Sequence, residues 1–273
     1  MTTRDARIAF IGGGNMASAI IGGLIRQGLP ATQVAVVEPV AEARQRLQAQ
    51  FGVQAQESAG PALADAGLVV WAVKPQTFKD AAAQAQAHVR NALQLSVAAG
   101  IRSDSIAQWL GTERVVRSMP NTPALVGKGM TALFAREAAT ADDRQQVERV
   151  IATTGEYLWV EREQQLDAVT ALSGSGPAYV FYFLEAMTQA GTELGLSAEQ
   201  ARRLAVGTFV GASELARASQ DPLELLRERV TSKGGTTHAA ITSMEADGVK
   251  AEFVQAMRAA CRRAEELGDA FGK

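Results

Sequence analysis

The chain has 273 residues, 47% of them hydrophobic and 21% charged, which is typical of a globular protein with room for one large or two ordinary domains. Its net charge is −2 and its lysines and arginines are scattered, so we expect neither nucleic acid nor a membrane surface as a partner. The single cysteine, Cys261, excludes an internal disulfide framework and favours a cytoplasmic location. The apolar runs are interrupted well short of the length of a membrane span.

The residue types that carry metal and nucleophile chemistry are scarce. The two histidines, His88 and His238, have no metal-ligand spacing to each other or to Cys261. We therefore expect no metal site, and a Ser-His-Asp hydrolase is poorly supported.

The first part of the chain alternates short apolar runs with helical patterns. Continuous apolar runs such as Leu68–Val73 and Leu93–Ala99 are typical of parallel strands that are buried on both faces. The alternation predicts a Rossmann-type doubly wound parallel sheet. The predicted strands are 7–11, 34–37, 68–73, 93–99, 114–117, 130–134 and 156–160, with the first two helices at 16–27 and 40–50.

From Gln165 onward the patterns are helical throughout. Ser197 with Gln200 predicts a capping box. Asp221-Pro222 with Glu224 predicts an N-cap at Asp221, a proline at the first helical position and a second capping box. The apolar stripes are wide enough to be covered by a second copy of the chain, so we expect a homodimer. We predict a dinucleotide-binding domain over residues 1–163 and an all-helical substrate-binding and dimerisation domain over residues 164–273.

A glycine loop follows the first predicted strand. Gly12 permits a tight turn, Gly14 lets the backbone approach a pyrophosphate, and the small Ala17 allows close packing of helix and strand. Glu38 ends the second strand, where an acidic residue accepts hydrogen bonds from the adenosine ribose and slightly favours NADH. The alternatives are a ligand-free turn and, for Glu38, a solvated charge.

Three further strand ends carry unusual residues at the edge where such sheets bind ligands. We expect cofactor contacts there from small or polar residues. Lys74-Pro75 could equally begin a helix, and Asn121, in a stiff double-proline loop, could fasten that loop to neighbouring backbone. The expected contacts are Ala72, Val73, Lys74, Pro75, Ala98, Gly100 and Asn121.

Two polar, glycine-containing runs interrupt the helical half, at residues 172–179 and 230–237. Each precedes a predicted helix and offers backbone N–H groups and hydroxyls. Because no basic cluster accompanies either run, they suit a carboxylate better than a second phosphate. Ordinary helix capping, with Thr236 or Thr237 as the N-cap, is the alternative.

Taken together, these motifs resemble the Δ1-pyrroline-5-carboxylate reductase family. The resemblance covers essentially the whole chain and rests on IAFIGGGNMASAIIGGL, AVKP, VRSMPNTPALVGKGM, DAVTALSGSGPAYVF and VTSKGGTTHAAI. It implies reduction of (S)-1-pyrroline-5-carboxylate to L-proline with NADPH or NADH. It also implies a helical dimerisation domain and, often, a higher assembly such as a ring of dimers.

The resemblance also assigns site residues. Gly12, Gly14, Asn15 and Met16 match the pyrophosphate loop, and residues 72–75 match a segment beside the nicotinamide. Lys233 departs from the family, which commonly has proline there, so it either points to solvent or supplements carboxylate attraction. The residues that match the loop for the substrate carboxylate and imine are Thr231, Ser232, Gly234, Gly235, Thr236 and Thr237, with Ser175 at the neighbouring helix start.

The scarcity of histidine suits imine reduction, because a cyclic imine can arrive already protonated and needs no general acid from the protein. The expected catalytic contact is the Thr237 hydroxyl on the imine nitrogen. One alternative is a hydroxy-acid dehydrogenase of the 6-phosphogluconate type, which would need a catalytic lysine such as Lys233 or Lys250. Another is a non-catalytic dinucleotide sensor, which would not need the hydroxyls of the second half.

Overall fold

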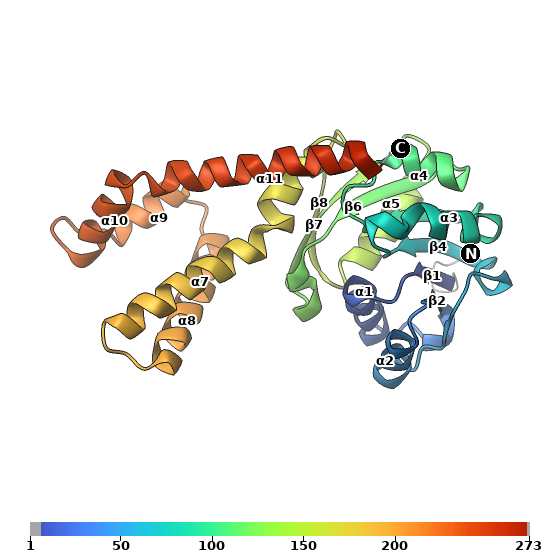
Figure 1. Ribbon diagram of the computed structural model, residues 1–273, viewed down its shortest axis with the longest axis horizontal. Helices are drawn as coiled ribbons and strands as arrows, with labels where there is room; N and C mark the ends of the chain where they lie inside the picture. The colour runs from blue at the N-terminus through green and yellow to red at the C-terminus, as the bar shows by residue number, and fades with distance from the viewer. Residues whose placement is uncertain (1–6, 272–273) are drawn as a thin grey trace. The chain divides into compact units, whose positions relative to one another are not determined.

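The computed structural model describes residues 7–271, which form two compact units. The first unit comprises the chain up to Ser175 together with the residues from Ala260 on, and the second comprises Gly176–Ala259 (Figure 1). Within the described residues, the helices do not have the length and apolar character needed to cross a membrane.

The first unit is built on an eight-stranded sheet with the order β3-β2-β1-β4-β5-β6-β7-β8. All the predicted strands are present, with ends displaced by a few residues. A further strand, β3, was not predicted because it has two residues and neither of them is buried. The strands are β1 (Arg7–Ile11), β2 (Val34–Val37), β3 (Ala55–Gln56), β4 (Ala66–Trp71), β5 (Leu93–Ser96), β6 (Val115–Met119), β7 (Gly129–Ala135) and β8 (Gly155–Trp159).

Helices cover both faces of this sheet and enclose two separate hydrophobic cores. Phe10 of β1 packs on one face with side chains from α1, α2 and α5, while the next residue, Ile11, packs on the other face with α3 and α4. This alternation is why the strands read as continuous apolar runs. The helices are α1 (Asn15–Arg26), α2 (Ala41–Phe51), α3 (Pro75–Val89), α4 (Ser103–Leu110), α5 (Ala141–Ile151) and α6 (Gln165–Val169), with short 3-10 turns η1 (Ala31–Gln33), η2 (Pro61–Leu63) and η3 (Thr122–Val126).

The predicted doubly wound parallel sheet is confirmed, with one antiparallel pair of strands as the exception. β7 runs antiparallel to β6, with Met119 opposite Ala132, whereas β7 and β8 are parallel. The connection between β6 and β7 spans residues 120–128 and carries only η3, which is too short for the crossover of a dozen or more residues that a parallel pair requires.

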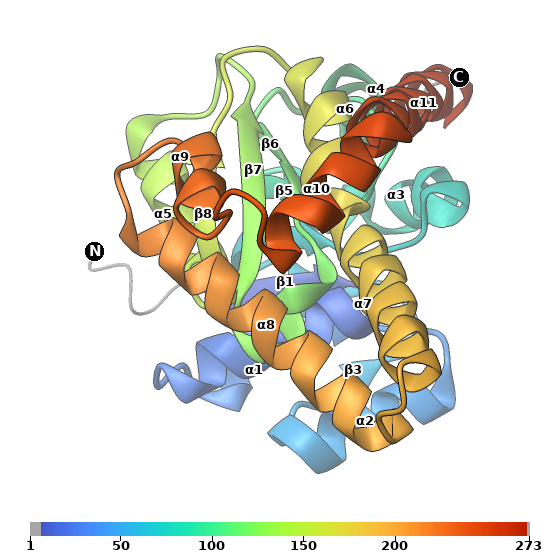
Figure 2. The ribbon, with the colours of Figure 1, turned by 90° about the vertical axis from the view of Figure 1, so that its left-hand side faces the viewer.

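The second unit is entirely helical (Figure 2). The predicted capping box at Ser197 is confirmed, because the Ser197 hydroxyl accepts the N–H of Gln200 at 3.2 Å and the Gln200 side chain accepts the N–H of Ser197 at 3.0 Å. The cap predicted at Asp221 is wrong, because the Asp221 carboxylate pairs instead with Arg229 and the helix begins after Pro222. The helices are α7 (Gly176–Glu193), α8 (Ala198–Ala218), α9 (Leu223–Arg229), α10 (Thr236–Ala246) and the first part of α11 (Val249–Phe271), up to Ala259.

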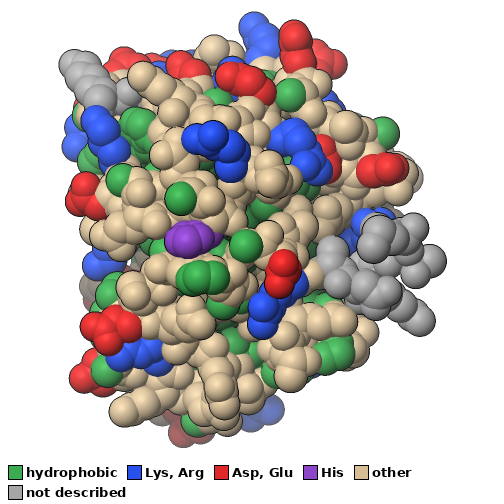
Figure 3. Space-filling view, turned by 90° about the vertical axis from the view of Figure 1, so that its right-hand side faces the viewer, with side chains coloured by type: hydrophobic (Ala, Val, Ile, Leu, Met, Phe, Trp, Pro, Cys, Tyr) green, Lys and Arg blue, Asp and Glu red, His purple; other side chains and the backbone are tan. Residues whose placement is uncertain are grey.

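The compact units divide the chain differently from the expected boundary between residues 163 and 164. α6 and the turn after it pack on β6 and β7, so the first unit extends to Ser175. The end of α11 also belongs to the first unit, where Arg102 pairs with Asp269 at 2.7 Å. On the face of the first unit in Figure 3, charges of both signs are interspersed.

Asp143 ties the start of α5 to the strand layer. Its carboxylate accepts the N–H of Thr140 at 3.0 Å and two hydrogen bonds from Arg114, at 2.6 and 3.0 Å. Burial alone would raise the pKa of Asp143, but these bonds outweigh burial and hold the pKa below its usual value.

We expect Asp143→Asn to lower the free energy of unfolding at neutral pH by about 1–2 kcal/mol, because it removes a capping interaction and a charge-assisted pair. A carboxyl group with a lowered folded pKa contributes stability above its unfolded pKa of about 4, and the contribution is lost as the pH falls through the folded pKa. The difference from wild type should therefore shrink below about pH 4 in urea unfolding series. Asp142→Asn, at the exposed neighbouring position, is the matched control. Equal effects of the two substitutions would contradict this account.

Candidate dinucleotide and substrate sites

Gly12 lies where the ends of three strands converge. Its backbone has a φ of 98°, and a Cβ there would lie 2.5 Å from the carbonyl oxygen of Ala72. Its N–H donates to the Val37 carbonyl oxygen at 2.8 Å, so β1, β2 and β4 all meet at this residue. A side chain cannot be placed at this position, which accounts for the first glycine of the motif.

The start of α1 has the features of an anion site. Gly14 is the N-cap and offers no capping side chain, the first turn contains no acidic residue, and a Cβ at Gly14 would meet nothing within 4 Å. The first-turn N–H groups of Asn15 and Met16 have no acceptor within the helix. Ala17 is fully buried against the sheet. The open approach and the positive end of the helix dipole fit a dinucleotide pyrophosphate.

Glu38 is not a solvated charge at a strand end. It is 8% exposed, and its carboxylate oxygens accept the N–H of Gly13 at 2.7 Å and the N–H of Val40 at 2.8 Å. It therefore joins the end of β2 to the glycine loop. Its contact with a ribose stays a prediction.

The segment after β4 lies beside Gly12, as the motif predicts. Ala72 donates its N–H to the Ile11 carbonyl oxygen at 2.8 Å, and Val73 is the nearest side chain to the position of a Gly12 Cβ. Lys74 is the N-cap of α3 and Pro75 its first residue, so the helix-start reading of this pair is confirmed. A cofactor contact from residues 72–75 stays a prediction.

Ala98 and Gly100 have packing roles that explain their small size. Ala98 is 4% exposed. Gly100 has a φ of 72° and is buried, and a Cβ there would lie 3.3 Å from Leu267 near the end of α11. Their contact with the cofactor stays a prediction.

Asn121 fastens two motifs to each other. Its side-chain oxygen accepts the N–H of Met130 at 2.9 Å, and its amide group donates to both the carbonyl oxygen and the hydroxyl of Ser173 at 3.2 Å. The alternative reading, in which Asn121 holds its loop in place, is therefore what the structure supports. A cofactor contact would have to share an amide that already has three partners.

A π-helical turn, Thr170–Gly174, carries Ser173 to this position. Ser175 donates its N–H to the Thr170 carbonyl oxygen at 2.8 Å, a bond spanning five residues, and a Cβ at Gly174 would lie 2.4 Å from the Met119 side chain. Such widened turns are frequent at functional sites. The sequence signal was the pair of glycines, which indicated a polar run but not this geometry.

The second polar run lies within the helical unit and ends at an uncapped helix. Gly235 is the N-cap of α10 with no capping side chain, and the first turn contains no acidic residue. Thr236 and Thr237 are therefore the first helical residues, and the alternative in which either is the N-cap is wrong. Gly234 has a φ of 74°, and the Thr231 hydroxyl donates to the Arg227 carbonyl oxygen at 2.6 Å.

Ser232 and Lys233 complete this run, and both are exposed, whereas Thr237 is half-buried. The exposure of Lys233 favours the reading in which it points to solvent, and a contribution to carboxylate attraction stays a prediction. The run therefore presents hydroxyls and free N–H groups at the positive end of a helix, an arrangement that suits a small carboxylate.

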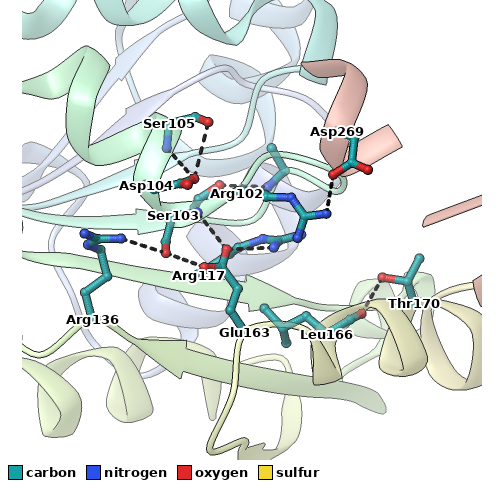
Figure 4. A network of polar contacts seen from close by, with 12 residues as sticks. Arg102, Ser103, Asp104, Ser105, Arg117, Arg136, Glu163, Leu166, Thr170 and Asp269 are labelled. Atoms are coloured by element: carbon teal, nitrogen blue, oxygen red, sulfur yellow. Dashed lines mark hydrogen bonds and ion pairs between the residues drawn. The ribbon is translucent and has the colours of Figure 1, made fainter. Parts of the chain in front are cut away.

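A buried polar network that the sequence did not indicate anchors the segment leading to Ser173 (Figure 4). Arg117 of β6 is 3% exposed and donates to the Glu163 carboxylate at 2.8 Å. Glu163 in turn accepts the N–H of Ser103 at 2.6 Å and its hydroxyl at 2.5 Å, and so caps α4 from sixty residues away. The available signal was the arginine within an apolar strand, because a buried arginine needs an acidic partner.

Asp167 lies buried in the same region. Burial raises the pKa of the Asp167 carboxyl, and the positive charges of Arg117 and Arg102 partly offset this effect. Arginines from β6 and the start of α4 thus surround two acidic residues of the segment 163–167 and hold it on the sheet.

The sheet, the glycine loop and the acidic residue at the end of β2 define a dinucleotide-dependent oxidoreductase with a helical second unit. Residues 7–100 match the family model described as NADP oxidoreductase coenzyme F420-dependent, and residues 163–267 match that described as pyrroline-5-carboxylate reductase dimerisation. The chain belongs to the pyrroline-5-carboxylate reductase family.

Individual relatives agree over nearly the full length. A pyrroline-5-carboxylate reductase of Pseudomonas aeruginosa is 48% identical over 271 residues, which cover 98% of each chain. The structure of a pyrroline-5-carboxylate reductase from Coxiella burnetii is 36% identical, with a TM-score of 0.88 over 96% of this chain and 98% of that one. The Plasmodium falciparum pyrroline carboxylate reductase structure with NADP bound is 26% identical, with a TM-score of 0.87 over 97% and 99% of the two chains.

We expect Glu163→Gln to lower the free energy of unfolding by about 3 kcal/mol, because it removes the carboxylate to which the buried Arg117 donates. The matched control is Glu266→Gln, which breaks an exposed pair with Arg263 and should change the free energy by less than about 0.5 kcal/mol. Denaturant unfolding of both variants measures the difference. A Glu163→Gln variant as stable as the control would show that the network does not anchor this segment.

Proposed function

We propose that the protein reduces (S)-1-pyrroline-5-carboxylate to L-proline, using NADH or NADPH as the hydride donor. The observation that carries this proposal is the near full-length identity to pyrroline-5-carboxylate reductases, 48% over 98% of the chain. The glycine loop at α1 and the uncapped start of α10 supply the two binding elements that such a reaction requires.

The start of α10 binds the substrate carboxylate. The N–H groups of the first helical turn are free to donate, because Gly235 at the N-cap has no side chain that could accept from them. The hydroxyls of Ser232 and Thr236 can donate to the same anion. The positive end of the helix dipole offsets the carboxylate charge. The run therefore serves the substrate, whereas the loop at α1 serves the cofactor pyrophosphate.

The Thr237 hydroxyl contacts the imine nitrogen and orients the ring. A protonated cyclic imine is already electrophilic, so the protein does not have to supply a proton to it. NAD(P)H, when bound, supplies the hydride that converts the imine carbon to the saturated centre of proline. The remaining work of the protein is to hold the ring in a reactive orientation. A substrate contact from Ser175 stays a prediction.

The helical unit forms a homodimer in this proposal. Apolar side chains on its helices are widely exposed in the single chain, with Tyr182 at 70% and Leu215 at 71%. A groove of about 510 Å³ lies among α7, α9, α10 and α11, and its apolar lining comes from Phe183, Leu223, Ile241, Met244, Val249 and Phe253. A second copy of the chain covers these surfaces. A higher ring of dimers and a cytoplasmic location remain predictions.

Pyrroline-5-carboxylate should be reduced with loss of NAD(P)H absorbance, and a 2-hydroxy acid tested with the oxidised nucleotide should give no turnover.

We expect Thr237→Ala to lower kcat/KM by about 10- to 100-fold, because the substrate loses one hydrogen bond to a charged group. Thr237→Ser keeps the hydroxyl and should lose much less. Wild-type kcat/KM in Thr237→Ala would refute the assigned role, and turnover of the hydroxy acid alone would refute the proposed reaction.

For the dimer, Leu215→Glu should shift the protein toward monomer in sedimentation velocity, because it places charges in an apolar interface. Val40→Glu alters a similarly exposed apolar side chain of the first unit, 52% exposed, and should leave the dimer intact. A wild-type protein that is monomeric at the enzyme assay concentration would contradict the proposal.

A further inference from the structure

The carboxylate of Glu38 is fixed in place at the end of β2. One oxygen accepts the N–H of Gly13 at 2.7 Å, and the other accepts the N–H of Val40 at 2.8 Å. Both partners are donors, which matches the acceptor-only character of an ionised carboxylate. Glu38 is 8% exposed, and its side chain cannot swing into solvent to make room for another anion without breaking both bonds.

The same two bonds place the negative charge beside the glycine loop. Gly13 stands between Gly12 and Gly14, and a Cβ there would lie 3.2 Å from the Glu38 side chain and 2.8 Å from Leu47. In sheets of this type, an acidic residue at the end of the second strand faces the adenosine ribose. Each Glu38 oxygen has accepted one hydrogen bond and retains a lone pair for a ribose hydroxyl.

The neighbouring arginine, Arg44, already has partners within the protein. Arg44 of α2 donates from one guanidinium nitrogen to the carbonyl oxygens of Glu38 at 2.8 Å and of Pro39 at 2.7 Å. A second nitrogen lies 3.6 Å from the Glu57 carboxylate. An arginine near this position is the group that commonly accommodates a 2′-phosphate. Here the arginine instead holds the turn that carries Glu38.

We propose that Glu38 is the residue that determines nucleotide specificity, and that the enzyme prefers NADH to NADPH. The fixed carboxylate accepts a hydrogen bond from the 2′-hydroxyl of NADH, whereas it repels the doubly charged 2′-phosphate of NADPH. Arg44 does not compensate, because one of its guanidinium nitrogens donates to two backbone carbonyl oxygens and a second lies beside the Glu57 carboxylate. This inference rests on the dinucleotide site of the proposed function and adds its selectivity.

The test measures the dissociation constants of NADH and NADPH for the full-length protein without substrate, from the change in nicotinamide fluorescence. Wild type should bind NADH at least about tenfold more tightly, the difference expected for one fixed charge beside a phosphate. Glu38→Gln should bring the two constants to within about threefold of each other, because the charge is gone. If the substitution loosens the loop and weakens both nucleotides equally, this effect cancels in the ratio of the two dissociation constants.

Two matched variants separate this account from its rivals. Glu42→Gln removes an exposed acidic charge from the first turn of α2 and should leave the ratio unchanged. Arg44→Gln loosens the turn that carries Glu38, so it should weaken the binding of both nucleotides alike. A selective loss of NADPH binding would show that Arg44 receives the 2′-phosphate. Equal or tighter binding of NADPH by wild type would overturn the proposal whether or not the variants fold.

Failure of this inference is distinguishable from failure of the proposed function. Turnover of pyrroline-5-carboxylate with either nucleotide supports the reaction regardless of the ratio. A tenfold preference for NADH in binding, without turnover of that substrate, would support the role of Glu38 and refute the reaction.

Discussion

Two helix starts that lack a capping side chain are the constraint on which the functional account depends. α1 begins after Gly14 and α10 begins after Gly235, and neither N-cap offers an oxygen to the first-turn N–H groups. α5 and α8 instead have complete capping boxes at Thr140 and Ser197. Other helices, such as α2 and α3, also lack a capping side chain. α1 and α10 differ from these two because their N-cap is a glycine and their first turn has no acidic residue, which leaves the helix start open to an anion.

The two starts are prepared by different local means. At α1, Gly12 is pressed against the Ala72 carbonyl group, and the Glu38 carboxylate takes up the N–H of Gly13. The N–H groups that remain free belong to Gly14 and the first turn of the helix, so they all lie at the start of α1. At α10, Gly234 adopts a positive φ and Gly235 leaves the helix end bare. In each motif one glycine, Gly12 or Gly234, permits the turn, and another, Gly14 or Gly235, leaves the helix start open to a ligand.

The sequence predicted those features that depend on neighbours along the chain. The strand positions, the glycine turn, the Ser197 cap and the helix start at Pro75 all follow from residues within a few positions of each other. Features that depend on distant partners were missed. The Asp221 cap failed because Arg229, at the far end of the same helix, pairs with the carboxylate. The β6–β7 pair was taken as parallel although the short connection between its strands already excluded a crossover.

The candidate site shows the same division. The sequence placed the side-chain amide of Asn121 in a stiff double-proline loop. Its partner Ser173 lies 52 residues away, and no local pattern reveals that contact. The pairing of Arg117 with Glu163, 46 residues apart, was equally invisible. Both contacts hold the segment that ends at Ser175 against the ends of β6 and β7. The residues of this part of the site could be identified from short sequence motifs, but the long-range polar bonds that position them could not.

The central claim is that the bare start of α10 binds the substrate through its carboxylate. The most direct test compares kcat/KM for pyrroline-5-carboxylate with kcat/KM for 1-pyrroline, the same cyclic imine without the carboxylate. If the helix start holds the carboxylate, removal of that group should lower kcat/KM by about 100-fold or more, since a charge-assisted contact is lost together with the orientation of the ring. Equal kcat/KM values for the two imines would contradict the account.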